Sequence, residues 1–93
     1  MRLTRINEFQ AAEGRTTELF AFLKGLVPYI ANSVGCESCE VLQSADNENL
    51  FVVIEKWDSE ASHKASLALY PKEKMAAAMP LIGAPPKGGF FHS

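Results

Sequence analysis

The sequence GCESCEVLQSADNENLFVVIEKWDS, residues 35–59, decides the fold of this chain. Two segments rich in β-forming residues, 36–44 and 50–57, flank a polar stretch at 45–49 that holds one Asp and two Asn residues. Side chains of these types hydrogen-bond their own backbone and are typical of turns. The pattern therefore predicts a β-hairpin.

The second strand of this hairpin is apolar on both faces through its middle. Successive side chains of a strand point to opposite faces, so one face carries Phe51, Val53, Glu55 and Trp57 and the other carries Leu50, Val52, Ile54 and Lys56. A strand buried on one face alone would alternate apolar with polar residues. The chain has helices enough to cover one face, so we expect the other face to meet a second subunit in a homodimer.

Length and composition predict one small domain over residues 1–93. A chain of this size buries roughly 60–65% of its unfolded surface, which leaves a marginal core and favours association. The hydrophobic fraction is 47%, as expected for a globular protein, so the composition excludes general disorder.

The charge pattern and hydropathy exclude several classes of function. Nine Lys and Arg against eleven Asp and Glu give a net charge of −2 with no basic run, so we expect no nucleic-acid binding. The first ten residues lack the apolar core of a signal peptide. The longest nearly apolar run, 75–86, contains three prolines and is too short to span a bilayer. We therefore expect a cytoplasmic protein without membrane contact.

The remaining elements give the order strand, helix, strand, strand, helix, strand. Hydrophobic spacing and turn residues predict a first strand at 3–10, a helix at 17–33, a second helix from about 59 to 69, a short third helical segment at 72–79 and a closing strand at 90–92. This order is that of an α+β, ferredoxin-like (β-α-β-β-α-β) domain with an antiparallel sheet.

The helix ends also carry recognisable signals. Thr16 or Thr17 is a suitable N-cap for the first helix. Asp58 or Ser59 is suitable for the second. Pro28 falls inside the first helix, where it removes one hydrogen bond and is expected to bend the axis.

Cys36 and Cys39 form a lone Cys-x-x-Cys pair. Zinc needs three or four protein ligands, and no second cysteine pair is present. The two residues are an odd number apart on a predicted strand, so we expect their sulfurs on opposite faces. Redox-active pairs of this type stand at a helix N-terminus, which this segment is not. We interpret both as reduced structural cysteines and expect no bound metal.

The element order together with the central stretch resembles the antibiotic biosynthesis monooxygenase (ABM) family of dimeric α+β barrels. The resemblance covers most of the chain. Its most specific parts are Gly35-Cys36 at the start of the second strand, FVVIEKW at 51–57 followed by Asp58-Ser59, and His63-Lys64-Ala65 on the next helix. The resemblance implies a homodimeric barrel, and for some members a cofactor-independent oxygenation.

Three polar or aromatic residues are candidates for the active site: His63, Trp57 and Asn7. His63 falls near a helix N-terminus, which favours the neutral imidazole that can accept a proton. It could instead be a partly buried histidine satisfied by a local hydrogen bond. Trp57 ends a strand, and its indole N–H needs a partner such as Glu55 if it is buried. Asn7 could bind a ligand carbonyl or hydroxyl, or could lie at a sheet edge or a dimer contact.

Aromatic and methionine side chains could line an apolar cavity beside these residues, although most such side chains are simply core. The candidates for substrate binding are Phe9, Phe22, Phe51, Met75 and Met79. Haem-degrading relatives of the fold also use an Asn in their first strand. The positions of their Trp and His ligand are occupied here by Ser66 and Ala76, so the resemblance does not favour haem.

The resemblance thus implies a monooxygenase without cofactor, acting on dioxygen and a small electron-rich phenol, quinol or polyketide-type substrate. His63 would be the base, with Trp57 and Asn7 positioning the ring and its oxygens. The alternative is a non-enzymatic module that binds a hydrophobic ligand or serves a stress response on the same dimeric barrel.

Overall fold

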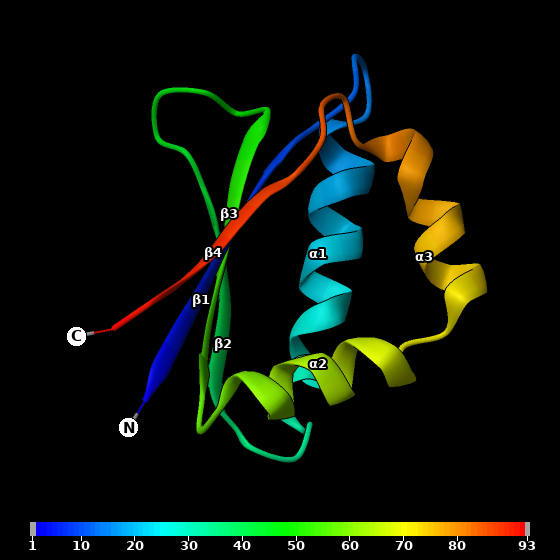
Figure 1. The fold of residues 1–93 in the computed structure, drawn as a ribbon. Helices are drawn as coiled ribbons and strands as arrows, with labels where there is room; N and C mark the ends of the chain where they lie inside the picture. Colours follow the sequence, from blue (N-terminus) through cyan, green and yellow to red (C-terminus); the bar gives the residue numbers. More distant parts are fainter. Residues whose placement is uncertain (1, 93) are drawn as a thin grey trace.

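Four strands and three α-helices follow one another in the predicted order in the computed structural model, which describes residues 2–92 (Figure 1). The elements are β1 (Leu3–Gln10), α1 (Thr16–Ala31), β2 (Cys36–Gln43), β3 (Leu50–Trp57), α2 (Glu60–Leu69), α3 (Lys72–Ala78), the 3-10 helix η1 (Met79–Leu81) and β4 (Lys87–Phe91). The hairpin expected from residues 35–59 is β2 and β3. No helix within the described range is long and apolar enough to span a membrane.

The strands form one antiparallel sheet in the order β2-β3-β1-β4. The two strands of the hairpin thus lie to one side of β1, and the last strand lies to the other. This interleaved order is the ferredoxin-like topology, so the predicted fold class is confirmed. In the register of β1 on β3, Leu3 lies opposite Trp57 and Arg5 lies opposite Glu55.

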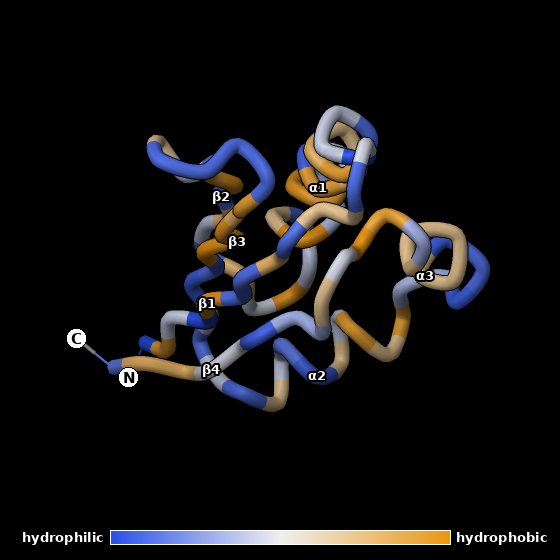
Figure 2. The backbone as a smooth tube through the Cα atoms, turned by 90° about the horizontal axis from the view of Figure 1, so that it is seen from above, coloured by the Kyte–Doolittle hydropathy of each residue, from blue (hydrophilic) through white to orange (hydrophobic). Residues whose placement is uncertain are grey.

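All helices lie on one side of the sheet, which we call the helix face (Figure 1; Figure 2). Leu19 and Leu23 of α1 pack there against Phe51 and Val53 of β3, and all four side chains are buried. Glu55 and Trp57, further along the same face of β3, are also buried. The two-residue repeat of a strand therefore grouped these residues of β3 on one face correctly, and the structure shows that this is the face that the helices cover.

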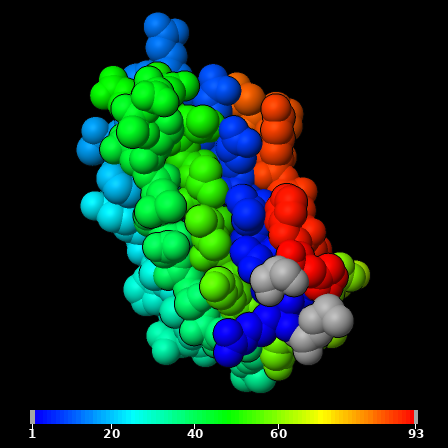
Figure 3. Space-filling view, turned by 90° about the vertical axis from the view of Figure 1, so that its left-hand side faces the viewer, coloured from blue at the N-terminus to red at the C-terminus, as the bar shows by residue number. Residues whose placement is uncertain are grey.

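The opposite side of the sheet, the open face, has no helix over it (Figure 3). It presents the apolar side chains Ile6, Leu42, Val52, Ile54 and Phe91. Leu42 and Phe91 are 47% and 52% exposed, and the other three are half-buried. The described residues thus leave an apolar sheet surface in contact with water.

The N-cap predicted for α1 was wrong. The N-cap residue is Arg15, which makes no side-chain capping bond, and the hydroxyl of Thr16 instead hydrogen-bonds the side chain of Asn49. This contact ties the start of α1 to the hairpin loop. The helix also ends at Ala31, two residues earlier than expected, and it includes Pro28.

The N-terminus of α2 was predicted correctly, because Ser59 caps it and accepts a hydrogen bond from the backbone N–H of Ser62. Gly35 lies against this cap with φ of +87°. A Cβ atom at that position would lie 2.6 Å from Oδ1 of Asp58 and would also collide with Ser62. Only a glycine combines this backbone conformation with so close an approach.

The strand β4 starts three residues earlier than predicted, at Lys87 instead of residue 90. The Gly-rich segment was expected to be loop, since glycine is depleted in strands. The free edge of β1 pairs with it nevertheless, and Gly88 lies opposite Asn7.

The prediction that Cys36 and Cys39 face opposite ways was wrong. A bulge between Cys36 and Ser38 shifts the register, so that Cys36 lies opposite Trp57 and Cys39 lies opposite Glu55. Both cysteines therefore belong to the helix face. Both are free thiols, and burial raises the pKa of Cys39 to about 12, so this thiol stays protonated at neutral pH.

Candidate functional site

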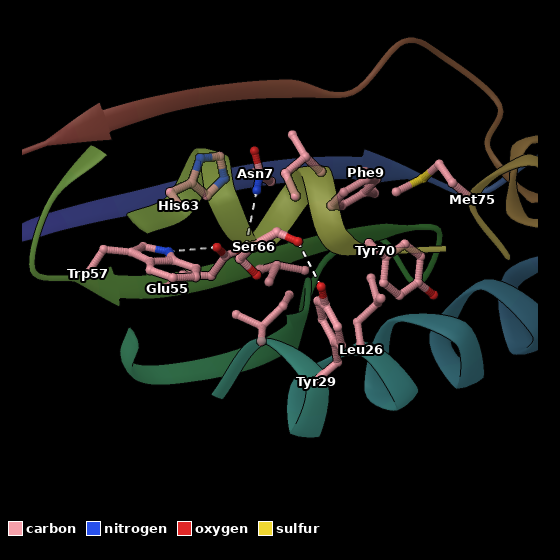
Figure 4. Close-up of a pocket in the computed structure, with 13 residues that line it drawn as sticks. Asn7, Phe9, Leu26, Tyr29, Glu55, Trp57, His63, Ser66, Tyr70 and Met75 are labelled. Atoms are coloured by element: carbon pink, nitrogen blue, oxygen red, sulfur yellow. Dashed lines mark hydrogen bonds between the residues drawn. The ribbon is translucent and has the colours of Figure 1, made fainter. Parts of the chain in front are cut away.

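A pocket of about 100 Å³ lies between the helix face of the sheet and the helices, beside the core (Figure 4). It is mostly apolar, with a few polar groups. Its lining comes from β1, α1, β3, α2, α3 and the turn between the last two helices: Asn7, Phe9, Leu26, Tyr29, Ile30, Val53, Glu55, Trp57, His63, Ser66, Leu67, Tyr70 and Met75. Such a concave, apolar site with a few convergent polar groups is the usual form of a small-molecule site.

The structure brings together the three candidate catalytic residues from three different elements. Asn7 comes from the middle of β1, Trp57 from the last position of β3 and His63 from the first turns of α2. They meet because β1 and β3 are neighbours, and α2 begins three residues after the end of β3. Of the candidate substrate-binding residues, Phe9 and Met75 line the same pocket.

Glu55 is the polar centre of this group. Its side chain accepts hydrogen bonds from Nε1 of Trp57 (2.9 Å) and from Nδ2 of Asn7 (3.4 Å), and the residue is 4% exposed (Figure 4). Burial raises the pKa of Glu55 above its ordinary value of 4.5. The hydrogen bond from Trp57, the positive charge of Arg5 and the hydrogen bond from Asn7 oppose the rise. Trp57, Arg5 and Asn7 thus offset part of the hydration that the carboxylate loses on burial.

The imidazole of His63 lies edge-on between two aromatic rings. The ring centroids of Trp57 and Phe90 are 5.6 Å and 5.2 Å away, both in T-shaped geometry. Nδ1 of His63 is buried and has no hydrogen-bond partner. Burial, the larger effect, and the charge of Arg5 hold the pKa of His63 below its ordinary value of 6.5. The side chain is therefore a neutral imidazole at pH 7, able to accept a proton.

Comparison with known proteins agrees with this architecture. A family model described as antibiotic biosynthesis monooxygenase matches residues 2–77. The chain belongs to the ABM family. A search of curated proteins found no match.

Solved structures of low identity share the fold of this ABM chain over nearly its full length. SnoaB from Streptomyces nogalater, described as a cofactor-independent oxygenase, is 20% identical with a TM-score of 0.84, covering 99% of this chain and 92% of its own. Rv0793 from Mycobacterium tuberculosis is 18% identical with a TM-score of 0.87, covering 100% and 95%. PA3566 from Pseudomonas aeruginosa is 22% identical with a TM-score of 0.89, covering 99% and 93%.

Three of the candidate substrate-binding residues do not line the pocket of this ABM protein. Phe51 is fully buried in the core, with its ring centroid 5.0 Å from that of Phe20. Phe22 packs against the same core cluster, and Met79 is 57% exposed on η1. Apolar periodicity places these residues near the helix face without showing which of them border an empty space.

The wall of the pocket contains residues that the sequence did not single out. The hydroxyl of Tyr29 donates a 2.7 Å hydrogen bond to the carbonyl oxygen of Ser66, and its ring lies 5.1 Å from that of Tyr70 in T-shaped geometry. Ser66 also exchanges a hydrogen bond with Ser33. The signal available in the sequence was the spacing of Tyr29 three residues after Leu26, which places both on one side of α1.

The pocket offers few ligands for a metal or haem. Within residues 2–92, no group of three or more His, Cys, Asp or Glu side chains is arranged to hold a metal ion. Of the two positions that correspond to the Trp and the His ligand of haem-degrading relatives, Ser66 forms part of the wall and Ala76 is exposed. His63 is the one imidazole that lines the pocket.

Proposed function

We propose that this ABM protein is a cofactor-independent monooxygenase acting on an electron-rich phenol, quinol or polyketide-type ring. The observation that carries the proposal is His63, a neutral imidazole with a buried, unpartnered Nδ1, in an apolar pocket beside Asn7 and Trp57. A buried nitrogen without a partner costs roughly 1–3 kcal/mol. A ligand hydroxyl that donates to it would recover that free energy.

In the proposed reaction, the protein has to remove a proton from the substrate, bind the resulting anion and exclude water. The substrate supplies all four electrons that reduce dioxygen: a ring carbon that carries hydrogen becomes a carbonyl carbon with one of the oxygen atoms, and the other oxygen atom leaves as water with the two hydrogens that the substrate gives up. His63 would take the proton from the substrate and so create the electron-rich anion that reacts with dioxygen. Asn7 would bind the anionic oxygen, and Trp57 would hold the ring. The apolar wall would keep water from the reactive intermediate.

The size of the pocket sets a condition on the substrate. A dry apolar cavity of roughly 150 Å³ takes up a benzene molecule, whereas this pocket measures about 100 Å³. A phenolic ring therefore enters only if side chains at the pocket move. Leu67 is 57% exposed and Met75 is a flexible side chain, so these two residues would make room.

The family match and the fold shared with SnoaB, described as a cofactor-independent oxygenase, support this class of reaction. The open face supports a second part of the proposal, that two copies of the chain pair through their sheets. Ile54 and Val52 are only half-buried in the single chain, and a self-complementary apolar sheet would bury them.

Oxygen uptake by the pure protein with a panel of quinols and phenols tests the proposal. His63→Ala should lower turnover by roughly 100-fold or more, the usual scale for a general base. His92→Ala is the matched control, because His92 is exposed and is not part of the pocket lining. The rate should rise with pH through an apparent pKa below 6.5, because only the neutral imidazole of His63 accepts a proton.

The alternative is a non-enzymatic module that binds a hydrophobic ligand. The observation in its favour is that His63 is the one histidine among the residues that line the pocket. If His63→Ala retains full oxygen uptake, the assignment of the base is wrong. If no member of the panel is oxidised by the parent while a ring compound binds and raises its thermal midpoint, the binding module replaces the enzyme.

A further inference from the structure

Arg5, Asn7 and Glu55 are neighbours on the helix face of the sheet. Arg5 and Asn7 are two residues apart on β1, and Glu55 lies opposite Arg5 on β3. Nδ2 of Asn7 donates a hydrogen bond to Oε2 of Glu55. The nitrogen end of the Asn7 amide therefore points toward the carboxylate.

The oxygen end of the same amide points toward β4. A Cβ atom at Gly88 would collide with Oδ1 of Asn7 and would lie 2.5 Å from Nη2 of Arg5. The two polar atoms thus approach the same point above Gly88, in space that any side chain on this residue would fill. A glycine on β4 allows the amide oxygen and the guanidinium to come close together.

The guanidinium of Arg5 is held in place without a carboxylate in direct contact. Its Cζ lies 4.8 Å from the centroid of the Phe90 ring, and its Nε is buried without a hydrogen-bond partner. The ion pairs found among residues 2–92 do not include Arg5. Its charge nevertheless acts on both Glu55 and His63. Arg5 is therefore a fixed positive charge beside the pocket.

The Asn7 amide thus lies between opposite charges, with its oxygen toward the guanidinium of Arg5 and its nitrogen toward the carboxylate of Glu55. Turning the amide over would place its oxygen against the carboxylate and its N–H groups against the cation. Both contacts would then be repulsive, so this environment permits one orientation. The carboxamide nitrogen carries two hydrogens, and Glu55 accepts one of them.

We propose that Arg5 and Glu55 are positioning residues that fix the Asn7 amide as a hydrogen-bond donor to an oxyanion in the pocket. With its oxygen turned to Arg5, Asn7 offers a ligand an N–H and no acceptor. At the position of Asn7 the site therefore selects a ligand oxygen that accepts a hydrogen bond, such as a carbonyl or the phenolate that forms once His63 has taken the proton, over a hydroxyl that donates one. The inference rests on the proposed function only in naming a phenolate as the anion. The donor role of Asn7 would be the same for a ligand that is bound without turnover.

The test uses 4-nitrophenol as probe, because its absorbance distinguishes phenol from phenolate and its binding needs no reaction. A fixed donor should lower the pKa of the bound probe below that of the free probe, with phenolate bound roughly tenfold or more tightly than phenol. Asn7→Ala should abolish the lowering. Arg5→Met should reduce it, and Arg5→Lys, which keeps the positive charge, should retain most of it.

The variant Glu55→Gln distinguishes two explanations: that Glu55 positions the Asn7 amide, or that it affects the bound probe only through its negative charge. Removing a negative charge would by itself lower the pKa of the bound probe further. If Glu55 positions Asn7, the substitution instead raises the probe's pKa toward the free value, because the Gln amide offers N–H groups where Asn7 needs an acceptor. A lower probe pKa in Glu55→Gln, an unchanged one, or a parent protein that does not lower the probe's pKa would each overturn the inference.

An independent measurement needs no ligand and no variant. In the NMR spectrum of the parent protein, the side-chain amide of Asn7 and the indole N–H of Trp57 should respond to the same pH titration, that of Glu55. Among the other titratable groups, Arg5, Cys36 and Cys39 interact electrostatically with this carboxylate, and His63 lines the same pocket. An Asn7 signal that is unaffected while the Trp57 signal shifts would contradict the inference. Neither experiment measures oxygen uptake, so an inactive protein would refute the proposed function and leave this inference standing.

Discussion

Replacing Glu55 with glutamine should change how the stability of the protein depends on pH. Burial raises the pKa of Glu55 in the folded protein above its ordinary value of 4.5. The folded state therefore binds a proton more readily than the unfolded state between those two pKa values. The stability linked to this proton is fully present below the unfolded pKa and is lost as the pH rises through the folded pKa.

The linkage between proton binding and folding sets the size of this change in the free energy of unfolding. A difference of one bound proton changes the free energy of unfolding by about 1.4 kcal/mol per pH unit, which is the upper limit for one carboxyl group. For a domain of 60–100 residues, 1 kcal/mol corresponds to roughly 4–8 °C in the thermal midpoint. The parent should thus lose up to about 1.4 kcal/mol per pH unit relative to Glu55→Gln inside this window and nothing more above it.

Urea unfolding of both proteins across about pH 4 to 8 measures this difference, at one protein concentration because assembly changes apparent stability. Glu13→Gln is the control, since Glu13 is exposed in the turn before α1. The informative quantity is how the difference in free energy of unfolding between parent and variant changes with pH. A part of the difference that is the same at every pH is not informative. A slope of zero, or a parent that gains stability relative to Glu55→Gln as the pH rises, would refute the reasoning.

Three further predictions concern assembly, the α2 cap and cofactors. Ile54→Lys on the open face should dissociate or unfold a dimer in sedimentation experiments, whereas Val34→Lys, at a site that is 91% exposed, should leave it intact; a parent that is a folded monomer at micromolar concentration would contradict the dimer. Gly35→Ala should lower the free energy of unfolding by at least about 1–2 kcal/mol, because φ is +87° and Asp58 is too close. Gly25→Ala, where a Cβ atom meets nothing within 4 Å, should instead be stabilising by about 0.5–1 kcal/mol; equal effects at the two glycines would be inconsistent with the geometry. Elemental analysis and visible spectra of the purified protein should show no stoichiometric metal, flavin or haem, since the pocket supplies a single imidazole.

Much of the fold could be predicted because successive side chains of a strand such as β3 point to opposite faces. Phe51, Val53 and Trp57 had to share a face, and the structure buries all three. The site could be predicted in part for a related reason. The end of β3 and the start of α2 are joined by two residues, so Trp57 and His63 had to lie close together.

The remaining errors arise where one local contact overrides a pattern. One extra residue in the bulge after Cys36 places this side chain on the helix face. The hydrophobic pattern of the sequence contains no sign of this bulge. Thr16 had the right chemistry for a cap, but its hydroxyl bonds the hairpin loop. Gly88 was predicted to lie in a loop because glycine has a low strand propensity. This propensity does not include the pairing of residues 87–91 with the free edge of β1.

The sequence predicted Glu55 as the partner of Trp57, which the structure confirms, but it did not show that Asn7 also binds this carboxylate, because the pairing of strands far apart in the chain is not visible in the sequence. Here Trp57, Asn7 and Arg5 all approach it from the sheet, so the polar centre of the pocket is built entirely on paired strands. The groups that would have to move for a ring to enter belong to the helical side instead, chiefly Leu67. The pocket thus separates two tasks. The strands hold the carboxylate of Glu55 and its partners Asn7 and Trp57 in place, whereas α2 carries the proposed base His63 and Leu67, which we propose would move to admit a ring.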